Sequence, residues 1–518
     1  LASARTLDSD RQGEGDIASG ALRSDQDHPR EEIERGAASG TSEKRGKKKP
    51  QAVAASPKLR FEIKDLKLDV ERVAEPDDPI VVVVSHELPY PPRAGNQYRI
   101  HRYIAWLQQR GYQVLTVHCP LPGSESSDEL IGEAAHALKN LVVVQRDGRL
   151  LVSVASHVMP LIKGLSGTSV EVLDPELPIF EGEGREDFQE RVMLERAYCP
   201  DVLARALIHI NQGVEGRSVV ITAYAFVTRY LSRLSPETLT VIDTIDVFSS
   251  KEEKVDAFGV TGELRVTELQ ERELLMRGQI TMAIQEREGR EFERIAPARP
   301  VLTVGVDYDC APDHLAERPP AGSERRIALV GSGNAMNVKG ANDFLRHCWP
   351  LIRRDHPEVR LSVVGAVGRS LPAETPGVDV LGIVESLEEI YQSADVVINP
   401  TAAGTGLKIK TLEALAHHRR IVTWPNGVEG VPESLVEFCS VVSDWYQFYL
   451  AVSEALQFEP GEPVFSAEAR ALIAETLSSE SVYRLLGDAI DEHCRGSHAE
   501  GRLDHSSPDF VQSVETCA

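Results

Sequence analysis

One segment of this sequence brings together residues that can bind a phosphate group. Asn399–Ala416, NPTAAGTGLKIKTLEALA, follows a strand-like apolar run and contains Gly404 and Gly406. A glycine loop between a strand and a helix start presents free backbone N–H groups and the positive end of the helix dipole, and both favour an anion. Lys408 and Lys410 add two cations to the first helical turn, where cations alone are unfavourable. The combination indicates an anion bound between the lysines and the helix.

Lys410 and Glu413 lie three residues apart, so they share one face of the expected helix and can serve the same ligand. An ordinary strand-to-helix turn with solvated lysines has the same composition, and the segment alone does not decide between these two interpretations. A second pattern, Asp307–Tyr308–Asp309, has the Asp-x-Asp spacing of some metal sites. Its place in a connector favours a turn, and no His, Asp or Cys cluster has ligand spacing. We therefore expect no bound metal.

The composition limits the class of protein. The 518 residues are 42% hydrophobic, which suffices for real cores, and no apolar run approaches the roughly 18 residues of a membrane helix. The formal net charge of −24 argues against binding to nucleic acid or to an anionic membrane. Seven scattered cysteines without a CxxC pair indicate neither a zinc site nor a disulfide framework, and they fit a reducing cytoplasm. We expect no signal peptide, because Leu1–Arg60 has no apolar core of the needed length.

The sequence predicts two folded domains between polar tails. Residues 1–58 have almost no large apolar side chains, so we expect them to be disordered, and we expect 496–518 to form a flexible tail. Between these tails strands alternate with helices, which predicts the α/β class with parallel sheets. The first domain covers 59–303 and the second covers 304–479.

The expected elements follow from apolar runs and helix signals. In the first domain we expect strands at Ile80–Ser85, Gln113–His118, Leu141–Gln145, Leu151–Ala155, Ser218–Thr222, Thr240–Asp243 and Ile280–Ile284, and helices at Tyr98–Arg110, Phe188–Ala197, Asp201–His209 and Gly262–Arg277. In the second domain we expect strands at Ile327–Val330, Arg360–Val364, Val378–Leu381, Asp395–Ile398, Arg420–Thr423 and Ser440–Val442, and helices at Ala341–Arg354, Ser386–Gln392, Leu407–His417 and Asp444–Leu456. Pro350 should kink its helix, and Ser386 with Glu389 has the pattern of a capping box.

Seven motifs in order resemble those of a known enzyme family. The first domain contains SHELPYPPRAGNQYRIHRYIAWLQQRGYQV (Ser85–Val114) and VIDTIDVFSSK (Val241–Lys251), and VGVDYD (Val304–Asp309) follows where the chain enters the connector. The second contains VGSGNAMNVKGANDFLRHCWPLI (Val330–Ile352), followed by VVGAVG, DVLGIVESLEEIYQSADVVINP and GTGLKIKTLEALA. Together they resemble the retaining glycosyltransferases of the GT-B architecture, closest to the family 4 type, over about residues 80–480.

The resemblance implies a fold and an activity. The fold would have two doubly wound Rossmann-like domains with an inter-domain cleft, and a C-terminal helix at 480–495 would cross back to the first domain. The activity would be transfer of a sugar from a nucleotide-diphosphate donor to an acceptor with retention of anomeric configuration. The nucleotide-sugar is a substrate, and no cofactor is implied. The motifs leave open the base, the sugar, the oligomeric state, and whether the acceptor is a glycan, a lipid-linked glycan, a protein or a small molecule.

The resemblance also assigns roles to residues. Glu413 matches the glutamate that binds the ribose hydroxyls, and Lys410 matches a basic residue found in a subset of these enzymes, so the two are the expected catalytic residues. Lys339 with Gly340 resembles a phosphate-binding Lys-Gly pair, and Gly95 matches a glycine of the first loop. The expected donor-binding set is Gly95, Ser332, Asn337, Lys339, Gly404, Thr405, Gly406, Leu407, Lys408, Lys410 and Glu413. Possible acceptor-side residues are His86, Arg99, Asp243 and Asp246.

Three positions depart from the family pattern. Ser332 stands where many members have an arginine, Thr405 where many have a second glutamate, and Ile245 where a histidine contacts the donor sugar. Either the donor sugar is held differently or activity has been lost; relatives with the same glycine-plus-lysine version also lack that glutamate, which favours the former. Two alternatives stay open: a nucleotide-sugar-binding or scaffold protein without turnover, and a nucleotide-sugar 2-epimerase on the same fold.

Overall fold

The computed structural model describes residues 59–68, 79–173, 177–214, 218–250, 266–317, 319–320, 322–384, 386–404, 407–458 and 461–500, with side chains to 495. All of them lie in one compact unit that begins at Pro57. The expectations for residues 1–58, for Thr405 and Gly406, and for the tail beyond Glu500 fall outside the described residues.

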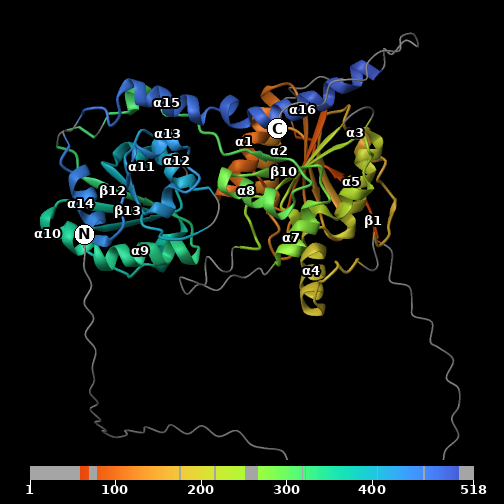
Figure 1. The fold of residues 1–518 in the computed structure, drawn as a ribbon. Coiled ribbons are helices and arrows are strands. Elements are labelled where there is room, and N and C mark those ends of the chain that lie inside the picture. Colours follow the sequence, from red (N-terminus) through yellow and green to blue (C-terminus); the bar gives the residue numbers. More distant parts are fainter. Residues whose placement is uncertain are drawn as a thin grey trace, which may run out of the picture. The chain divides into compact units, whose positions relative to one another are not determined.

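The first sheet has nine strands in the order β11-β10-β9-β8-β3-β4-β5-β6-β2 (Figure 1). The strands are β2 (Glu62–Asp65), β3 (Ile80–Ser85), β4 (Gln113–His118), β5 (Leu141–Val144), β6 (Arg149–Ser153), β8 (Val219–Ala223), β9 (Leu239–Asp243), β10 (Ile280–Ala283) and β11 (Val301–Thr303). β1 (Leu59–Arg60) pairs with β7 (Ser169–Val170) in a separate small sheet. The neighbours in the large sheet are parallel except for β5 and β6.

The antiparallel β5–β6 pair corrects the expectation of a purely parallel sheet. Only four residues connect Val144 to Arg149, and so short a connection allows a hairpin but not a crossover. Gly148 has φ +91° and its Cβ position would lie 2.6 Å from the Arg60 carbonyl oxygen, so the turn requires glycine.

Helices cover both faces of the first sheet (Figure 1). They are α1 (Gly95–Gln109), α2 (Asp128–Leu138), α3 (Met159–Lys163), α4 (Arg185–Tyr198), α5 (Asp201–Gly213), η1 (Ala225–Arg233), α7 (Glu268–Leu275) and α8 (Glu286–Ile295). All six residues of β3 are buried, because alternate residues pack on opposite faces. Val82 and Val84 share a core cluster with α5 and η1, whereas Val81 and Val83 pack with α1 and α2.

The second sheet is wholly parallel, in the order β14-β13-β12-β15-β16-β17. Its strands are β12 (Arg326–Val330), β13 (Arg360–Val364), β14 (Val378–Gly382), β15 (Val396–Asn399), β16 (Ile421–Thr423) and β17 (Cys439–Val441). Its helices are η2 (Asp313–Leu315), α9 (Ala335–His347), α10 (Trp349–Asp355), η3 (Ala366–Ser370), α11 (Glu388–Ser393), α12 (Ile409–Ala416), η4 (Pro425–Val428), α13 (Glu433–Val436), α14 (Trp445–Ala455), α15 (Ala467–Leu477) and α16 (Ser479–Glu500). The expected fold class, α/β with two doubly wound sheets, is confirmed.

Two local predictions in the second domain are wrong. The helix expected at Ala341–Arg354 is two helices that meet at Cys348, and Pro350 lies in the first turn of α10, where its missing N–H leaves no bond unmade. The Ser386 hydroxyl accepts a hydrogen bond from the Glu388 backbone N–H at 3.2 Å rather than from Glu389. The predicted capping box is therefore not formed, and Leu387 is the N-cap residue of α11.

Helix α16 ties the end of the chain to the first sheet. Tyr483, Leu486 and Ile490 are buried in the same cluster as α1, and α16 continues to Glu500, five residues into the expected tail. The Tyr483 hydroxyl donates to Asp307 in the connector at 2.6 Å.

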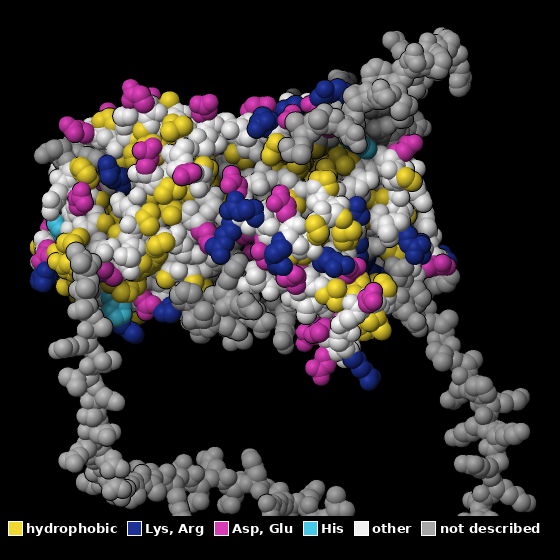
Figure 2. Space-filling model, in the orientation of Figure 1, with side chains coloured by type: hydrophobic (Ala, Val, Ile, Leu, Met, Phe, Trp, Pro, Cys, Tyr) yellow, Lys and Arg dark blue, Asp and Glu magenta, His cyan; other side chains and the backbone are white. Residues whose placement is uncertain are grey.

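On the face shown in Figure 2, acidic and basic side chains are interspersed between apolar ones.

Candidate functional site

The candidate site lies where the strand order of the second sheet reverses. From β12 the chain continues to β13 and β14 on one side and then returns to β15 on the other. Two neighbouring parallel strands whose connections lead to opposite sides leave a crevice at their carboxyl ends, which is where open α/β sheets bind ligands. The segments Gly331–Asn334 and Pro400–Gly404 leave β12 and β15 at this crevice, and α9 and α12 are the next helices along the chain.

Asn337 links the two loops. Its Nδ2 donates to the Ser332 hydroxyl at 3.0 Å and to the Ser332 carbonyl at 3.2 Å. Its Oδ1 accepts from Lys410 Nζ at 2.5 Å and from the Thr401 hydroxyl at 3.1 Å. Asn337 is 7% exposed, and its amide nitrogen and oxygen are held by residues that follow both strands. Asn334 caps α9 by accepting from the Asn337 N–H at 2.8 Å, which holds the start of this helix in place.

Lys410 lies in the first turn of α12 with its ammonium group on Asn337. A Cβ at Gly331 would lie 3.7 Å from Lys410 Nζ, so the ammonium group is packed close to the loop after β12. Burial lowers the pKa of Lys410 to about 8; Lys408 acts in the same direction and Glu413 opposes them. An anion beside this lysine and the helix N–H groups would stabilise its charged form and raise its pKa again.

Glu413 faces the same side of α12. Its Oε2 accepts from the Tyr391 hydroxyl at 2.8 Å, and the Tyr391 ring stacks on His417 with centroids 4.5 Å apart. Burial raises the pKa of Glu413, while the bond from Tyr391 and the charge of Lys410 oppose that rise. Tyr391 thus fixes the carboxylate and leaves its other oxygen available for ligand hydroxyls.

The start of α12 differs by two residues from the expected one. The helix begins at Ile409, which puts Lys408 at the N-cap position, and Leu407 packs in an apolar cluster instead of lining the crevice. Lys408 Nζ donates to the Gly404 carbonyl at 3.1 Å. Gly404 has φ +144°, a conformation that favours glycine.

One expected donor-binding residue, Lys339, stands apart from this cluster. Lys339 pairs with Asp343 at 2.6 Å along the surface of α9, and no described contact joins its ammonium group to Asn337 or Lys410. Gly340 has a packing role, because a Cβ there would lie 2.6 Å from the Pro400 carbonyl oxygen. Ser332 is exposed and enters the site only through its bonds with Asn334 and Asn337.

Gly95 lies at the contact between the two domains. It is the first residue of α1, three residues before the expected helix start, and is therefore not in a loop. A Cβ on Gly95 would lie 2.5 Å from Ile409 Cδ1, so the starts of α1 and α12 touch. Tyr98 stacks on Tyr308 of the connector with centroids 5.0 Å apart, and the Tyr308 hydroxyl donates to the Ile409 carbonyl at 3.3 Å.

The expected acceptor-side residues divide into two kinds. Arg99 and Asp243 are completely buried and pair with each other, with Arg99 Nη2 at 2.9 Å from Asp243 Oδ1. Arg99 Nη1 also donates to the carbonyls of Val304 and Gly305 at 2.7 and 2.5 Å. The structure therefore does not place this pair at a surface that an acceptor reaches; it joins α1, β9 and the connector.

His86 and Asp246 lie at carboxyl ends of first-sheet strands. The His86 ring packs edge-on against Tyr198 and Tyr224, with centroid distances of 4.6 and 4.5 Å, and its Nδ1 has no hydrogen-bond partner. Burial lowers the pKa of His86 to about 3, and His118 acts in the same direction. Asp246 is 8% exposed and adds to the burial effect that raises the pKa of Glu271.

Sequence reasoning missed Tyr391, Thr401 and Asn426, which bond to Glu413, Asn337 and Gly404, respectively. Tyr391 precedes β15, Thr401 follows β15 and Asn426 follows β16. No local spacing relates these residues to their partners. Among the residues that the structure describes, no group of three or more His, Cys, Asp or Glu side chains could hold a metal ion. In the same residues, no helix is both long and apolar enough to cross a membrane.

Comparisons with known proteins concern the family and the fold of the chain. The family model for glycosyl transferases group 1 matches residues 324–457. An uncharacterized 44.6 kDa protein in the cps region of Klebsiella pneumoniae is 22% identical over 158 residues, which cover 28% of this chain and 41% of that protein, so the match spans less than half of the relative.

Among solved structures, HepE of Anabaena, in complex with UDP and glucose, aligns with a TM-score of 0.51 and 9% identity. The alignment covers 79% of this chain and 99% of HepE, and at this identity it shows the fold alone. The family model of the group 1 glycosyl transferases thus matches residues 324–457, and the chain has the GT-B fold that its motifs imply.

Proposed function

We propose that this protein is a metal-independent, retaining glycosyltransferase that moves a sugar from a nucleotide-diphosphate donor to an acceptor. The observation that carries the proposal is the cluster of Asn337, Lys410 and Glu413 at the strand-order reversal of the second sheet. It combines an oriented ammonium group, a helix start and a fixed carboxylate within a domain of the group 1 family.

Each group has a part in the proposed reaction. The N–H groups at the start of α12 and the Lys410 ammonium stabilise the negative charge that develops on the leaving diphosphate. Asn337 keeps Lys410 aimed at that position, so little reorganisation is needed during the reaction. The Glu413 carboxylate, held by Tyr391, accepts hydrogen bonds from the ribose hydroxyls.

The first domain would present the acceptor. The carboxyl ends of β3 and β8 flank the strand-order reversal of the first sheet, and His86 and Tyr224 follow these two strands. Binding energy spent on placing the acceptor against the donor lowers the entropic barrier to transfer. A cytoplasmic location is part of the proposal, because seven scattered cysteines without a CxxC pair suit a reducing compartment.

One observation favours the second candidate, a nucleotide-sugar-binding protein without turnover. Ile245 adopts a left-handed conformation with φ +64°, which is rare for a β-branched residue, and its side chain packs against the apolar core. The position therefore supplies no polar side chain to a donor sugar at the end of β9.

A binding and turnover panel separates the two candidates. The first step is thermal unfolding with UDP-, GDP-, ADP- and dTDP-sugars, since a ligand at a hundred times its dissociation constant adds about 2.7 kcal/mol to the free energy of unfolding. UDP-glucose is tested first, because the HepE structure contains UDP and glucose. Release of the nucleotide with an acceptor panel, and an α-configured product from an α-configured donor, would support the transferase. Binding without any release would support the second candidate.

A further inference from the structure

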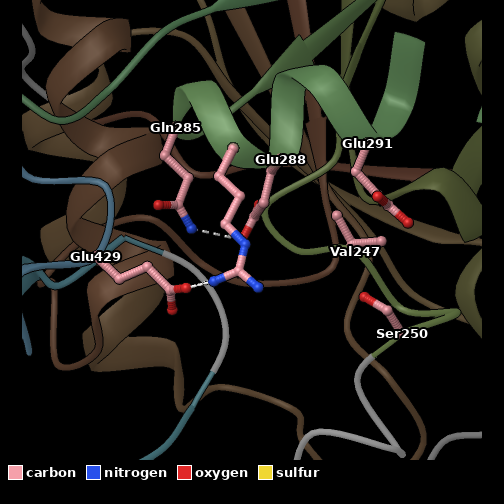
Figure 3. Close-up of a pocket in the computed structure, with 7 residues that line it drawn as sticks. Val247, Ser250, Gln285, Glu288, Glu291 and Glu429 are labelled. Carbon is pink, nitrogen blue, oxygen red and sulfur yellow. Dashed lines mark hydrogen bonds and ion pairs between the residues drawn. The ribbon is translucent and has the colours of Figure 1, made fainter. Parts of the chain in front are cut away.

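Two segments that follow strands, one in the first domain and one in the second, contact each other beside the candidate site. Arg287 lies in the first turn of α8 in the first domain, and its guanidinium group pairs with the carboxylate of Glu429, just after η4 in the second domain (Figure 3). The Arg287 side chain is 58% exposed and that of Glu429 is 22% exposed. The pair borders a cavity that Val247, Ser250, Gln285, Glu288 and Glu291 also line.

The Glu429 side chain is linked by hydrogen bonds to Gly404, in the segment between β15 and α12. Its Oε2 accepts from Asn426 Nδ2 at 3.0 Å, and the same Nδ2 donates to the Gly404 carbonyl at 3.1 Å. That carbonyl is also the one to which Lys408 Nζ donates at 3.1 Å. An unbroken series of polar contacts therefore leads from Arg287 in the first domain to the lysine at the start of α12.

A second contact holds the same loop against α8. Gly430 has φ +80°, and a Cβ there would lie 1.8 Å from Gln285 Oε1, so only glycine allows this approach. Gln285 Nε2 donates to Glu288 Oε1 at 2.9 Å, which fixes the amide from the helix side (Figure 3). The loop after η4 is thus seated on the N-terminal turn of α8 by a close backbone approach as well as by the ion pair.

We propose that Arg287 and Glu429 are positioning residues for donor binding: through Asn426 they set the conformation of the loop that presents Gly404 and Lys408 to the diphosphate. This inference rests on the proposed function for its ligand, and it gives the first domain a direct role in donor affinity. Neither residue is assigned a contact with the reacting atoms, and both act through the loop.

The expected effects are graded. A partly exposed ion pair contributes little by itself, so Arg287→Met and Glu429→Gln should each weaken UDP binding about two- to fivefold. Glu429→Ala also removes the acceptor for Asn426 and should weaken binding about tenfold. The double variant Arg287→Met with Glu429→Gln should weaken binding no more than the more affected single variant, because both substitutions remove the same contact.

The test uses the full chain and two readouts. Amide hydrogen exchange of peptides that cover residues 401–412 reports the loop without any ligand, and calorimetric titration with UDP reports affinity. The matched control is Arg290→Met, since Arg290 lies on the same helix and pairs at 3.6 Å with Glu286 of that helix, away from the second domain. We expect faster exchange at 401–412 in Arg287→Met and Glu429→Gln, wild-type exchange in Arg290→Met, and, in the double variant Arg287→Met with Glu429→Gln, exchange no faster than in the more affected single variant.

Wild-type exchange at 401–412 in both Arg287→Met and Glu429→Gln would overturn the inference, as would faster exchange with unchanged UDP affinity. Losses in the double variant that equal the sum of the two single losses would also count against it, because additive effects mean that the two side chains do not act through one contact. Failure of the wild-type chain to bind UDP, GDP, ADP or dTDP would instead overturn the proposed function and the donor role with it, while the exchange data would still report whether the contact holds the loop.

Discussion

The amide oxygen of Asn337 lies 2.5 Å from the ammonium nitrogen of Lys410, although 73 positions separate the two residues in the sequence. The contact exists because β12 and β15 are adjacent parallel strands, so the loops that follow them leave the sheet side by side. The Asn337 amide fixes the Lys410 ammonium group. It does so from α9, which lies on the other side of the strand-order reversal from α12.

Substitution of Asn337 should test whether orientation of Lys410 matters. Asn337→Ala leaves the buried ammonium without its acceptor, and loss of a hydrogen bond to a charged group is worth about 1–3 kcal/mol, or about five- to a hundredfold in donor affinity. The matched control is Asn342→Ala on the same helix, whose Nδ2 donates to the Val338 carbonyl at 2.8 Å. Titrations with UDP would measure both, and equal affinities would remove Asn337 from the site.

Lys410→Ala and Glu413→Ala should fail in different ways with the fold intact. In the proposed mechanism Lys410 contacts charge that develops during transfer. Its loss should therefore lower kcat about 100- to 1000-fold, which corresponds to about 2.7–4 kcal/mol of transition-state stabilisation. Glu413 should act mainly on donor affinity, because ribose hydroxyls are bound equally before and during transfer. Steady-state kinetics would separate kcat from KM, and wild-type kinetics in both variants would show that the site is elsewhere.

Donor affinity should fall as the pH rises above about 8. Burial lowers the pKa of Lys410 to about 8 in the free protein, and a bound diphosphate raises it by stabilising the ammonium form. The donor affinity is therefore highest below about pH 8. It falls as the pH rises from about 8 to the higher pKa that Lys410 has in the complex. The same shift from an ordinary value of 10.5 means that the ligand-free fold gains stability over pH 8 to 10.5, since the unfolded chain binds more protons there.

Titrations with UDP from pH 7 to 9.5 would measure the effect. Lys410→Met should bind weakly at every pH and lose the dependence. A wild-type affinity that stays constant across this range would contradict a depressed pKa at the diphosphate site.

Activity should survive EDTA. The proposal assigns stabilisation of the leaving diphosphate to Lys410 and to the N–H groups at the start of α12, and these do not depend on a divalent ion. Nucleotide release would be followed before and after chelation. Complete loss with recovery on addition of Mn²⁺ or Mg²⁺ would refute this part of the proposal.

Arg99→Met should destabilise the fold instead of changing acceptor use. Removal of one partner of a fully buried ion pair leaves an uncompensated charge and typically costs about 3–5 kcal/mol. The control is Arg294→Met, whose pair with Glu268 is 53% and 54% exposed and should leave the stability nearly unchanged. Urea unfolding would compare the midpoints. A stable Arg99→Met with an altered acceptor KM would restore the acceptor role to Arg99.

The local sequence determined the elements of this protein. The apolar run Ile80–Ser85 predicts a strand buried on both faces, and β3 has these bounds because that burial needs no information from elsewhere in the chain. The glycine loop before α12 and the shared helix face of Lys410 and Glu413 follow in the same way from spacing. Local reasoning erred where a neighbour decides the outcome, as at Pro350, which begins a new helix, and at Gly95, which belongs to α1.

Only the tertiary structure decided which partners these residues have. Asn337 reaches Lys410, Tyr391 reaches Glu413, and Arg287 reaches Glu429 through the order of strands and the seating of one domain on the other. Hydrophobic periodicity specifies which face of an element is buried, but it carries no information on which other element covers that face. For the same reason the sequence placed Arg99 and Asp243 near an acceptor, whereas packing of α1 on β9 buried both charges against each other.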